Sequence, residues 1–315
     1  MFKLITIGTF SALFFSSTFI LNRAMSLENG HWLWTASLRY GWMLLFLIGG
    51  LLLTGKAATL RKVFHLYRQH WLFWTLTGSL GFGVFYTLIS FSASYAPGWV
   101  IATTWQTTIL ASPLVLLLFG RAVPRKAILF IFIIFGGILL VNFEQLELST
   151  WNDLLLGGLP VLLAAFAYPI GNQILWEAQR NGTRLIPAIK DPLLDDAFNR
   201  ILLLTLGTIP FWLLLIIFIS PPLPSGGQLL NTALVAIFSG IVATSLFLQA
   251  RHLAADAYQI SAIDATQSSE VIFSLLGEII FLHGFLPGSK GWLGITLTVA
   301  GLTLYIRAQT PKDAA

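Results

Sequence analysis

Residues Tyr258 to Leu282 form one long segment with the sequence YQISAIDATQSSEVIFSLLGEIIFL. It is mostly apolar and long enough to cross a bilayer as a helix, which needs about 20 residues at about 1.5 Å of rise per residue. Three acids interrupt it: Asp264, Glu270 and Glu278. On a helical wheel these acids share one arc of roughly 120° with Gln267 and Ser274.

A column of acids facing lipid would be unfavourable. One charged side chain at the centre of a bilayer costs at least about 2.5–3.5 kcal/mol on insertion scales, and three would prevent insertion. We therefore expect this stripe to face protein or a water-filled cavity, while the Ile, Leu, Val and Phe side chains of the same helix face lipid or other helices.

The composition indicates a polytopic membrane protein. Hydrophobic residues make up 56% of the 315 residues and charged residues only 10%, whereas soluble domains carry about 25% charge. The net charge of +5 comes from short loops, which is typical of membrane orientation rather than nucleic-acid binding. The chain has no cysteine, no histidine at metal-ligand spacing and no phosphate-binding GxxxxGK[ST] run. We expect no cofactor, no metal site and no nucleic-acid partner.

The hydrophobic pattern predicts an all-α polytopic fold with ten transmembrane helices. The expected spans are Leu4–Asn22, Trp32–Leu53, Trp71–Ser94, Trp99–Phe119, Ala127–Phe143, Leu154–Trp176, Ile201–Ile219, Leu229–Gln249, Tyr258–Leu282 and Trp292–Ile306.

The loops between these spans have a strong charge bias. Of the 18 basic residues, fifteen fall in loops and termini on one side of the expected membrane: Lys3, Lys56, Arg61, Lys62, Arg68, Arg121, Arg125, Lys126, Arg180, Arg184, Lys190, Arg200, Arg251, Arg307 and Lys312. Because basic loops stay on the cytoplasmic side, we expect both termini to be cytoplasmic in a bacterial inner (plasma) membrane.

The two halves of the chain show weak matches in the same order. Trp105-Gln106-Thr107-Thr108 in the fourth span matches Thr266-Gln267-Ser268-Ser269 in the ninth, and Gly136-Gly137 in the fifth matches Ala300-Gly301 in the tenth. Five spans per half would make the second half inverted in the membrane. We therefore predict an N-terminal repeat over residues 1–148 and a C-terminal repeat over 149–315, an architecture typical of secondary transporters.

This pattern resembles the drug/metabolite transporter superfamily in its ten-helix, two-repeat form. The first span has the aromatic-small-small-polar-aromatic run Phe15 to Phe19, the second has Leu38-Arg39-Tyr40, and the ninth has Glu270 at the family's glutamate position. Val271 stands where that family usually has proline. This departure, with Ala167 to Gln173 and Ala265 to Val271, is similar to the multidrug-resistance efflux branch. The first span lacks the acid of the four-helix pumps, so their mechanism does not transfer.

Glu270 is our candidate for coupling, because an acid at mid-membrane suits exchange of a proton or a cation. Asp264 and Gln267 would support it as a gate or relay. A structural interpretation, in which these groups only fix helix packing, is the alternative for each residue. Asp264 could also partner Arg251. Glu278 and Arg39 both lie toward the outer face, and we expect an ion pair that either is structural or serves as an outer gate.

Polar and aromatic side chains elsewhere could complete a substrate site. Gln106 and Gln267 would supply amides, and Tyr86 and Trp105 a surface for cations. Interhelical hydrogen bonds and packing are the alternative interpretation. The remaining candidates are Thr103 in the fourth span and Tyr168 and Asn172 in the sixth.

These residues favour a secondary active transporter that exports a small cationic or zwitterionic metabolite or drug-like solute by alternating access, in exchange for protons if it is coupled. Small-molecule substrate and lipid are the expected partners, and the chain would be a monomer or homodimer. An intramembrane enzyme using an acid pair and a non-transporting scaffold or sensor are the alternatives from other classes.

Overall fold

The structure is a computed structural model that describes residues 2–119, 127–180, 182–253 and 266–309, with residues 259 and 263. Within those residues the regular secondary structure is entirely helical. The helices are α1 (Phe2–Leu27), α2 (Trp32–Leu53), α3 (Ala57–Gln69), α4 (Trp71–Gly78), η1 (Ser79–Val84), α5 (Phe85–Ser92), α6 (Gly98–Trp105), α7 (Thr107–Leu118), α8 (Ala127–Leu148), α9 (Trp151–Arg180), η2 (Pro192–Asp195), α10 (Ala197–Ile219), α11 (Gly226–Val235), η3 (Ala236–Ala243), α12 (Thr244–Leu253), α14 (Ser269–Leu282) and α15 (Ser289–Gln309).

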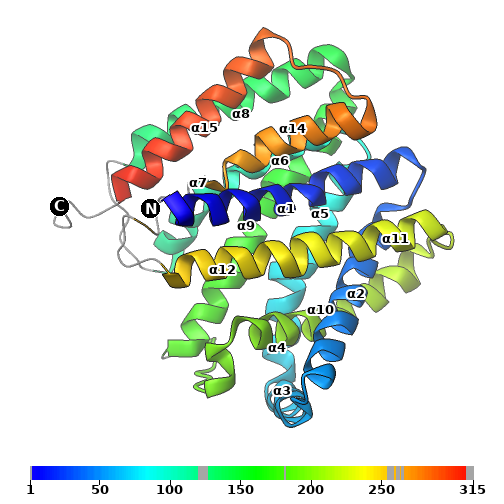
Figure 1. The fold of residues 1–315 in the computed structure, drawn as a ribbon, viewed down its shortest axis with the longest axis vertical. Coiled ribbons are helices and arrows are strands. Elements are labelled where there is room, and N and C mark those ends of the chain that lie inside the picture. The colour runs from blue at the N-terminus through cyan, green and yellow to red at the C-terminus, as the bar shows by residue number, and fades with distance from the viewer. Residues whose placement is uncertain are drawn as a thin grey trace.

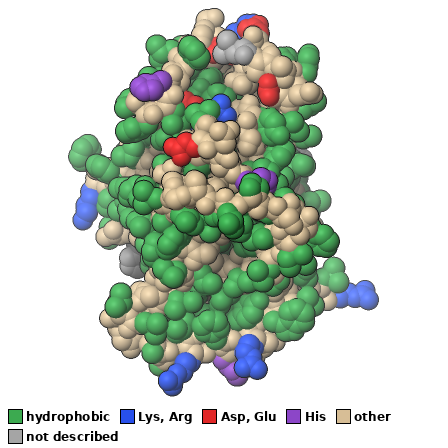
Figure 2. Space-filling model, turned by 90° about the vertical axis from the view of Figure 1, so that its right-hand side faces the viewer, with side chains coloured by type: hydrophobic (Ala, Val, Ile, Leu, Met, Phe, Trp, Pro, Cys, Tyr) green, Lys and Arg blue, Asp and Glu red, His purple; other side chains and the backbone are tan. Residues whose placement is uncertain are grey.

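Six helical segments of the described chain are long and apolar enough to cross a membrane. They are Phe2–Leu27, Trp32–Leu53, Trp71–Ser92, Trp151–Arg180, Ala197–Ile219 and Gly226–Phe247. The all-helical, multi-pass character predicted from composition is thereby confirmed. The count of ten spans and the inverted repeats stay predictions. Figure 2 shows that hydrophobic side chains cover much of one face, as lipid contact requires.

Two of the long helical columns contain a π-helical segment. In the first column η1 joins α4 to α5, and in the second η3 joins α11 to α12. These are the third and eighth expected spans. A π segment widens one turn and is frequent at functional sites. No π segment was predicted in either span.

Glycines allow several helices to approach closely around the first π segment. A Cβ atom on Gly207 in α10 would lie 2.0 Å from the backbone oxygen of Trp74 in α4, and one on Gly171 in α9 would lie 2.4 Å from the Cα of Gly81 in η1. The column of α4, η1 and α5 is therefore held between α9 and α10.

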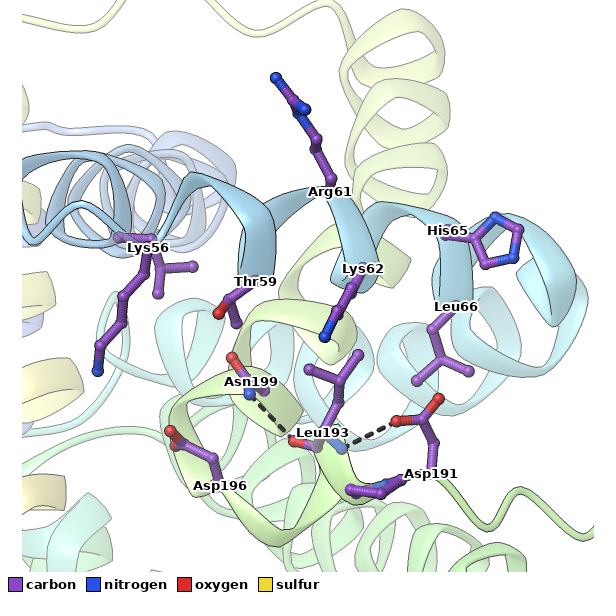
Figure 3. Close-up of a pocket in the computed structure, with 12 residues that line it drawn as sticks. Lys56, Thr59, Arg61, Lys62, His65, Leu66, Asp191, Leu193, Asp196 and Asn199 are labelled. Carbon is purple, nitrogen blue, oxygen red and sulfur yellow. Dashed lines mark hydrogen bonds between the residues drawn. The ribbon is translucent and has the colours of Figure 1, made fainter.

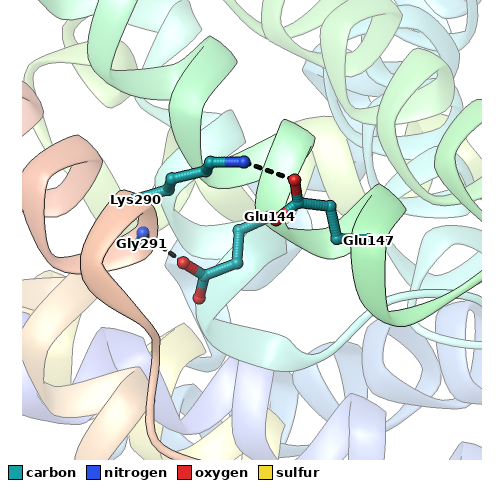
Figure 4. A network of polar contacts seen from close by, with 4 residues as sticks. All are labelled: Glu144, Glu147, Lys290 and Gly291. Carbon is teal, nitrogen blue, oxygen red and sulfur yellow. Dashed lines mark hydrogen bonds and ion pairs between the residues drawn. The ribbon is translucent and has the colours of Figure 1, made fainter.

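The helices α8 and α15 lie side by side along their whole length at one edge of the molecule (Figure 1). A Cβ atom on Gly137 would lie 2.5 Å from Thr298 Oγ1, so the close approach expected of the glycines in these spans is present. The helix α8 is one turn longer than the predicted Ala127–Phe143. Its extra turn carries the buried Glu144, whose carboxylate accepts hydrogen bonds from the backbone N–H groups of Gly288 and Gly291 (Figure 4).

Candidate functional site

Glu270 lies in the first turn of α14, which packs against α1 and α6. Its side chain is 8% exposed. Within the part of the chain that the structure describes, its carboxylate has no hydrogen bond and no ion pair. A buried carboxyl group without a partner is rare in a folded protein, and such groups cluster at functional sites.

The two residues just before α14 are not helical. Gln267 and Ser268 form a turn, and the Gln267 side-chain amide donates to the backbone oxygen of Gly8 in α1 at 3.4 Å. Because of this break, the expected span Tyr258–Leu282 is not one continuous helix. Asp264, the expected relay, lies outside the described residues.

The carboxylate of Glu278 stabilises the start of another helix. It accepts a 2.8 Å hydrogen bond from the backbone N–H of Gly98, the first residue of α6. A carboxylate at a helix N-terminus is favoured by the unpaired N–H groups and the helix dipole. The basic residue that acts on it electrostatically is Arg23 in α1, whose guanidinium donates to the backbone oxygen of Ala93.

The expected ion pair between Glu278 and Arg39 is not formed in this structure, because Arg39 has other neighbours. Its guanidinium lies 4.1 Å from the ring centre of Tyr86 and 5.7 Å from that of Tyr40. One Nη donates to the hydroxyl of Ser239 in η3 at 3.1 Å. The side chain is 9% exposed, and no acid of the described chain lies within ion-pair distance.

Several buried polar atoms around Arg39 lack partners among the described residues. They are the Arg39 Nε, the Asn22 Nδ2 and the Ser90 hydroxyl. Asn22 does accept a hydrogen bond from the Tyr86 hydroxyl at 3.1 Å. From the sequence, Asn22 was expected at a span end, and neither Ser239 nor Tyr40 was a candidate. The only signal for Asn22 was an amide inside an apolar run.

The predicted aromatic residues meet in one cluster. The rings of Phe85 and Trp105 have centroids 4.9 Å apart, those of Phe85 and Tyr168 5.1 Å, and those of Trp105 and Tyr168 5.7 Å. Phe85 and Tyr86 are adjacent in α5, so this cluster borders the Arg39 neighbourhood. Tyr86 already presents its ring to a cation, the guanidinium of Arg39.

The other predicted polar residues bond locally. The hydroxyl of Thr103 donates to the Trp99 oxygen at 2.8 Å within α6, and the amide of Gln106, the residue after α6, donates to the Ala102 oxygen at 3.2 Å. Gln106 marks the break between α6 and α7, as its predicted mate Gln267 marks the break before α14. Asn172 is exposed on α9.

These observations define the class: a multi-pass helical membrane protein with buried charges inside the bundle. A family model described as "EmrE: Putative multidrug resistance efflux transporter" matches residues 2–311. The chain belongs to this family, so it is a member of a family of membrane efflux transporters, whose partners are small-molecule substrates and lipid. The resemblance found in the sequence is confirmed.

Two curated relatives are themselves uncharacterised. The chain is 39% identical over 326 residues to the uncharacterised protein YjlA of Bacillus subtilis (strain 168), covering 98% of this chain and 96% of YjlA. It is 35% identical over 261 residues to an uncharacterised 42.1 kDa protein of Shouchella clausii, covering 79% and 64%. A solved crystal structure of a protein matches with a TM-score of 0.59 at 16% identity over 96% of this chain and 97% of that one, which supports the fold alone.

Proposed function

We propose that the protein is a secondary active transporter that exports a small cationic or zwitterionic solute by alternating access. The observation that carries the proposal is the Glu270 carboxyl, buried in the first turn of α14 with no partner in the described chain. A carboxylate inside a membrane needs a compensating positive charge. A cationic solute or a proton would supply it.

Competition between these two partners would couple transport to a proton gradient. When the solute leaves on one side, a proton takes its place on the carboxyl group, and only the occupied states move between the two sides. This is an antiport mechanism that needs one acid and no ATP-driven motor. Asp264 would relay protons between Glu270 and the end of the bundle that carries the basic loops.

Arg39 supports a solute that carries a negative group as well. Its guanidinium has one hydrogen bond, to Ser239, and no acid within ion-pair distance among the described residues. Two buried charges of opposite sign that do not pair with each other complement a zwitterion. The aromatic side chains of Tyr86, Trp105 and Tyr168 would contact its apolar part.

Two features support inverted repeats as the framework. Helix breaks occur at the matching residues Gln106 and Gln267, and π segments occur in the third and eighth expected spans. In transporters built from inverted repeats, discontinuous helices meet at the substrate site near the membrane midplane.

The test is a thermal-shift screen of purified protein against amines, amino acids, nucleosides and cationic dyes at pH 6 and pH 8. A ligand that binds the folded state raises the melting temperature. We expect cationic or zwitterionic compounds to stabilise the protein more at pH 8, where fewer protons compete. Glu270→Gln should abolish this difference.

The matched control is Glu144→Gln, which changes another buried acid whose partners are backbone N–H groups. It should keep the pH dependence of binding. A Glu270→Gln protein that binds the same compounds with the same pH dependence would contradict the coupling role. Transport by reconstituted protein of the compounds found then separates a transporter from a binding-only protein.

A further inference from the structure

A cavity of about 740 Å³ lies between α3 and the segment 191–199, away from Glu270 and Arg39. Figure 3 shows α3 crossing above this segment, with side chains of both elements facing the space between them. The lining includes Lys56, Thr59, Lys62, Leu193, Asp196 and Asn199.

The basic side chains of the cavity have no ion-pair partner in the part of the chain that the structure describes. No ion pair joins Lys56, Arg61 or Lys62 to an acid anywhere in the described ranges. In Figure 3, Lys56 and Lys62 extend from α3 toward the segment 191–199, whereas Arg61 extends the other way. The two lysines thus place their ammonium groups on the side of the cavity that faces the segment 191–199. Neither ammonium group is neutralised by an ion pair with a described acid.

The two acids of the cavity are used within their own segment. The Asp191 carboxylate accepts a 2.9 Å hydrogen bond from the backbone N–H of Leu193, and that of Asp196 accepts one of 2.8 Å from Phe198. Each caps the start of a helix, η2 or α10. They therefore hold the floor of the cavity in place, and within the described residues neither forms an ion pair with Lys56 or Lys62.

The helix α3 is amphipathic. Val63 and Leu66 are buried against the bundle, while Arg61, Lys62 and Arg68 are exposed. The ring of Phe64 is 39% exposed between the basic side chains, beside a second groove of about 360 Å³ lined by Leu60, Arg61, Phe64, His65 and Arg68. Basic residues together with an exposed aromatic side chain are typical of helices that lie in the headgroup region of a membrane.

The neighbouring surface is apolar. Leu51 lines the cavity, and the next two residues, Leu52 and Leu53, are 52% and 91% exposed at the end of the long helix α2. Acyl chains would contact these leucines while a headgroup occupies the cavity. Figure 2 shows Lys and Arg side chains gathered at the lower end of the molecule, below a hydrophobic surface.

We propose that this cavity binds the phosphate of an anionic phospholipid headgroup, held by Lys56 and Lys62. The phosphate would pair with these two ammonium groups, and the glycerol backbone leads to the exposed leucines. Because α3 joins α2 to α4, a bound headgroup would fix the position of the helix that carries Arg39. The proposal depends on membrane insertion and not on the transport function.

The experiment uses purified full-length protein in an uncharged maltoside detergent. Its melting temperature is measured during titration with a short-chain phosphatidylglycerol, with the matching phosphatidylcholine, and with inorganic phosphate. We expect phosphatidylglycerol to raise the melting temperature most. In the double variant Lys56→Gln/Lys62→Gln the titration midpoint should move to about thirtyfold higher lipid, from roughly fivefold per basic residue near an anionic lipid.

The matched control is Arg184→Gln, which removes an exposed charge of the same 182–196 connector outside the lining of the cavity. It should titrate like the natural protein. Equal midpoints for the double variant and the control would overturn the proposal. An equal shift with phosphatidylcholine would also overturn it, and saturation by inorganic phosphate alone would assign the cavity to a soluble phosphate instead of a lipid.

Discussion

Individual carboxylates in this protein stabilise helix ends. Glu278 accepts from the N–H of Gly98 at the start of α6, and Glu144 accepts from Gly288 and Gly291 at the start of α15. In both cases glycine leaves room for the carboxylate: a Cβ on Gly98 would lie 3.0 Å from the Glu278 oxygen, and one on Gly291 2.5 Å from a Glu144 oxygen. Glu270 has no such partner among the described residues, which separates it from these two acids.

A third helix end depends on a histidine. The Nδ1 atom of His31, outside the helices, accepts a 3.2 Å hydrogen bond from the N–H of Leu33 at the start of α2. Burial lowers the pKa of His31 from its ordinary value of 6.5. Protonation removes the acceptor, so the cap is fully effective above pH 6.5 and its stabilisation is lost as the pH falls from 6.5 toward the lowered pKa.

We therefore expect His31→Ala to lower the free energy of unfolding by about 1 kcal/mol at pH 8, and by less at pH 5. Unfolding in detergent at a series of pH values measures this. His31→Asn is the control, because asparagine caps without titrating and should remove this part of the pH dependence. A His31→Asn protein with the same acid sensitivity as the natural one would contradict the assignment.

At the scale of elements, glycine contacts set the distances between helices. The contact between α10 and α4 is the closest of these, since a Cβ on Gly207 would meet the backbone oxygen of Trp74 at 2.0 Å. Backbone cannot rotate away as a flexible side chain can, so the two helices must separate to accept one methyl group.

We expect Gly207→Ala to lower the free energy of unfolding by about 1–3 kcal/mol. The matched control is Gly41→Ala in α2, where a Cβ would meet no atom within 4 Å. That variant should be neutral or slightly stabilised, because alanine is the better helix former. Thermal unfolding of both proteins in one detergent compares them directly. Equal melting temperatures would mean that the α4–α10 contact is looser than described.

For the whole molecule, sequence periodicity predicted where helices form better than where they are interrupted. The second helix was predicted as Trp32–Leu53 and is found there. The helix α3 was missed, although Leu60, Val63, Phe64 and Tyr67 follow a helical period, because its basic residues were interpreted as a loop. Neither π segment, η1 or η3, was predicted, since one widened turn depends on packing between helices.

The candidate site shows the same limit. Glu270, Arg39, Tyr86 and Tyr168 were predicted as candidates because they are polar residues within apolar runs. In the structure the guanidinium of Arg39 lies over the ring of Tyr86. Partner choice was not predictable: Glu278 meets Gly98 instead of Arg39 because the N-terminus of α6 lies beside α14. Sequence patterns predict which face of a helix carries polar residues, but they do not predict which neighbouring helix packs against that face.

Orientation in the membrane is a property of the whole molecule that the chain allows us to test directly. Fifteen of its 18 basic residues fall in loops and termini expected on the cytoplasmic side. The start of α1 and the end of α15 lie at the same side of the bundle (Figure 1), in keeping with two termini on one side. Because the chain contains no cysteine, a single introduced thiol reports its own location.

We expect Gly226→Cys, at the exposed first residue of α11, to react with a membrane-impermeant maleimide in intact cells. Arg184→Cys, exposed in the basic connector after α9, should react only after the membrane is permeabilised. The two variants control for each other, since both thiols are exposed and differ only in the side they occupy. If only Arg184→Cys were labelled in intact cells, the orientation of the chain would be opposite to the one predicted here, and so would the direction assigned to export.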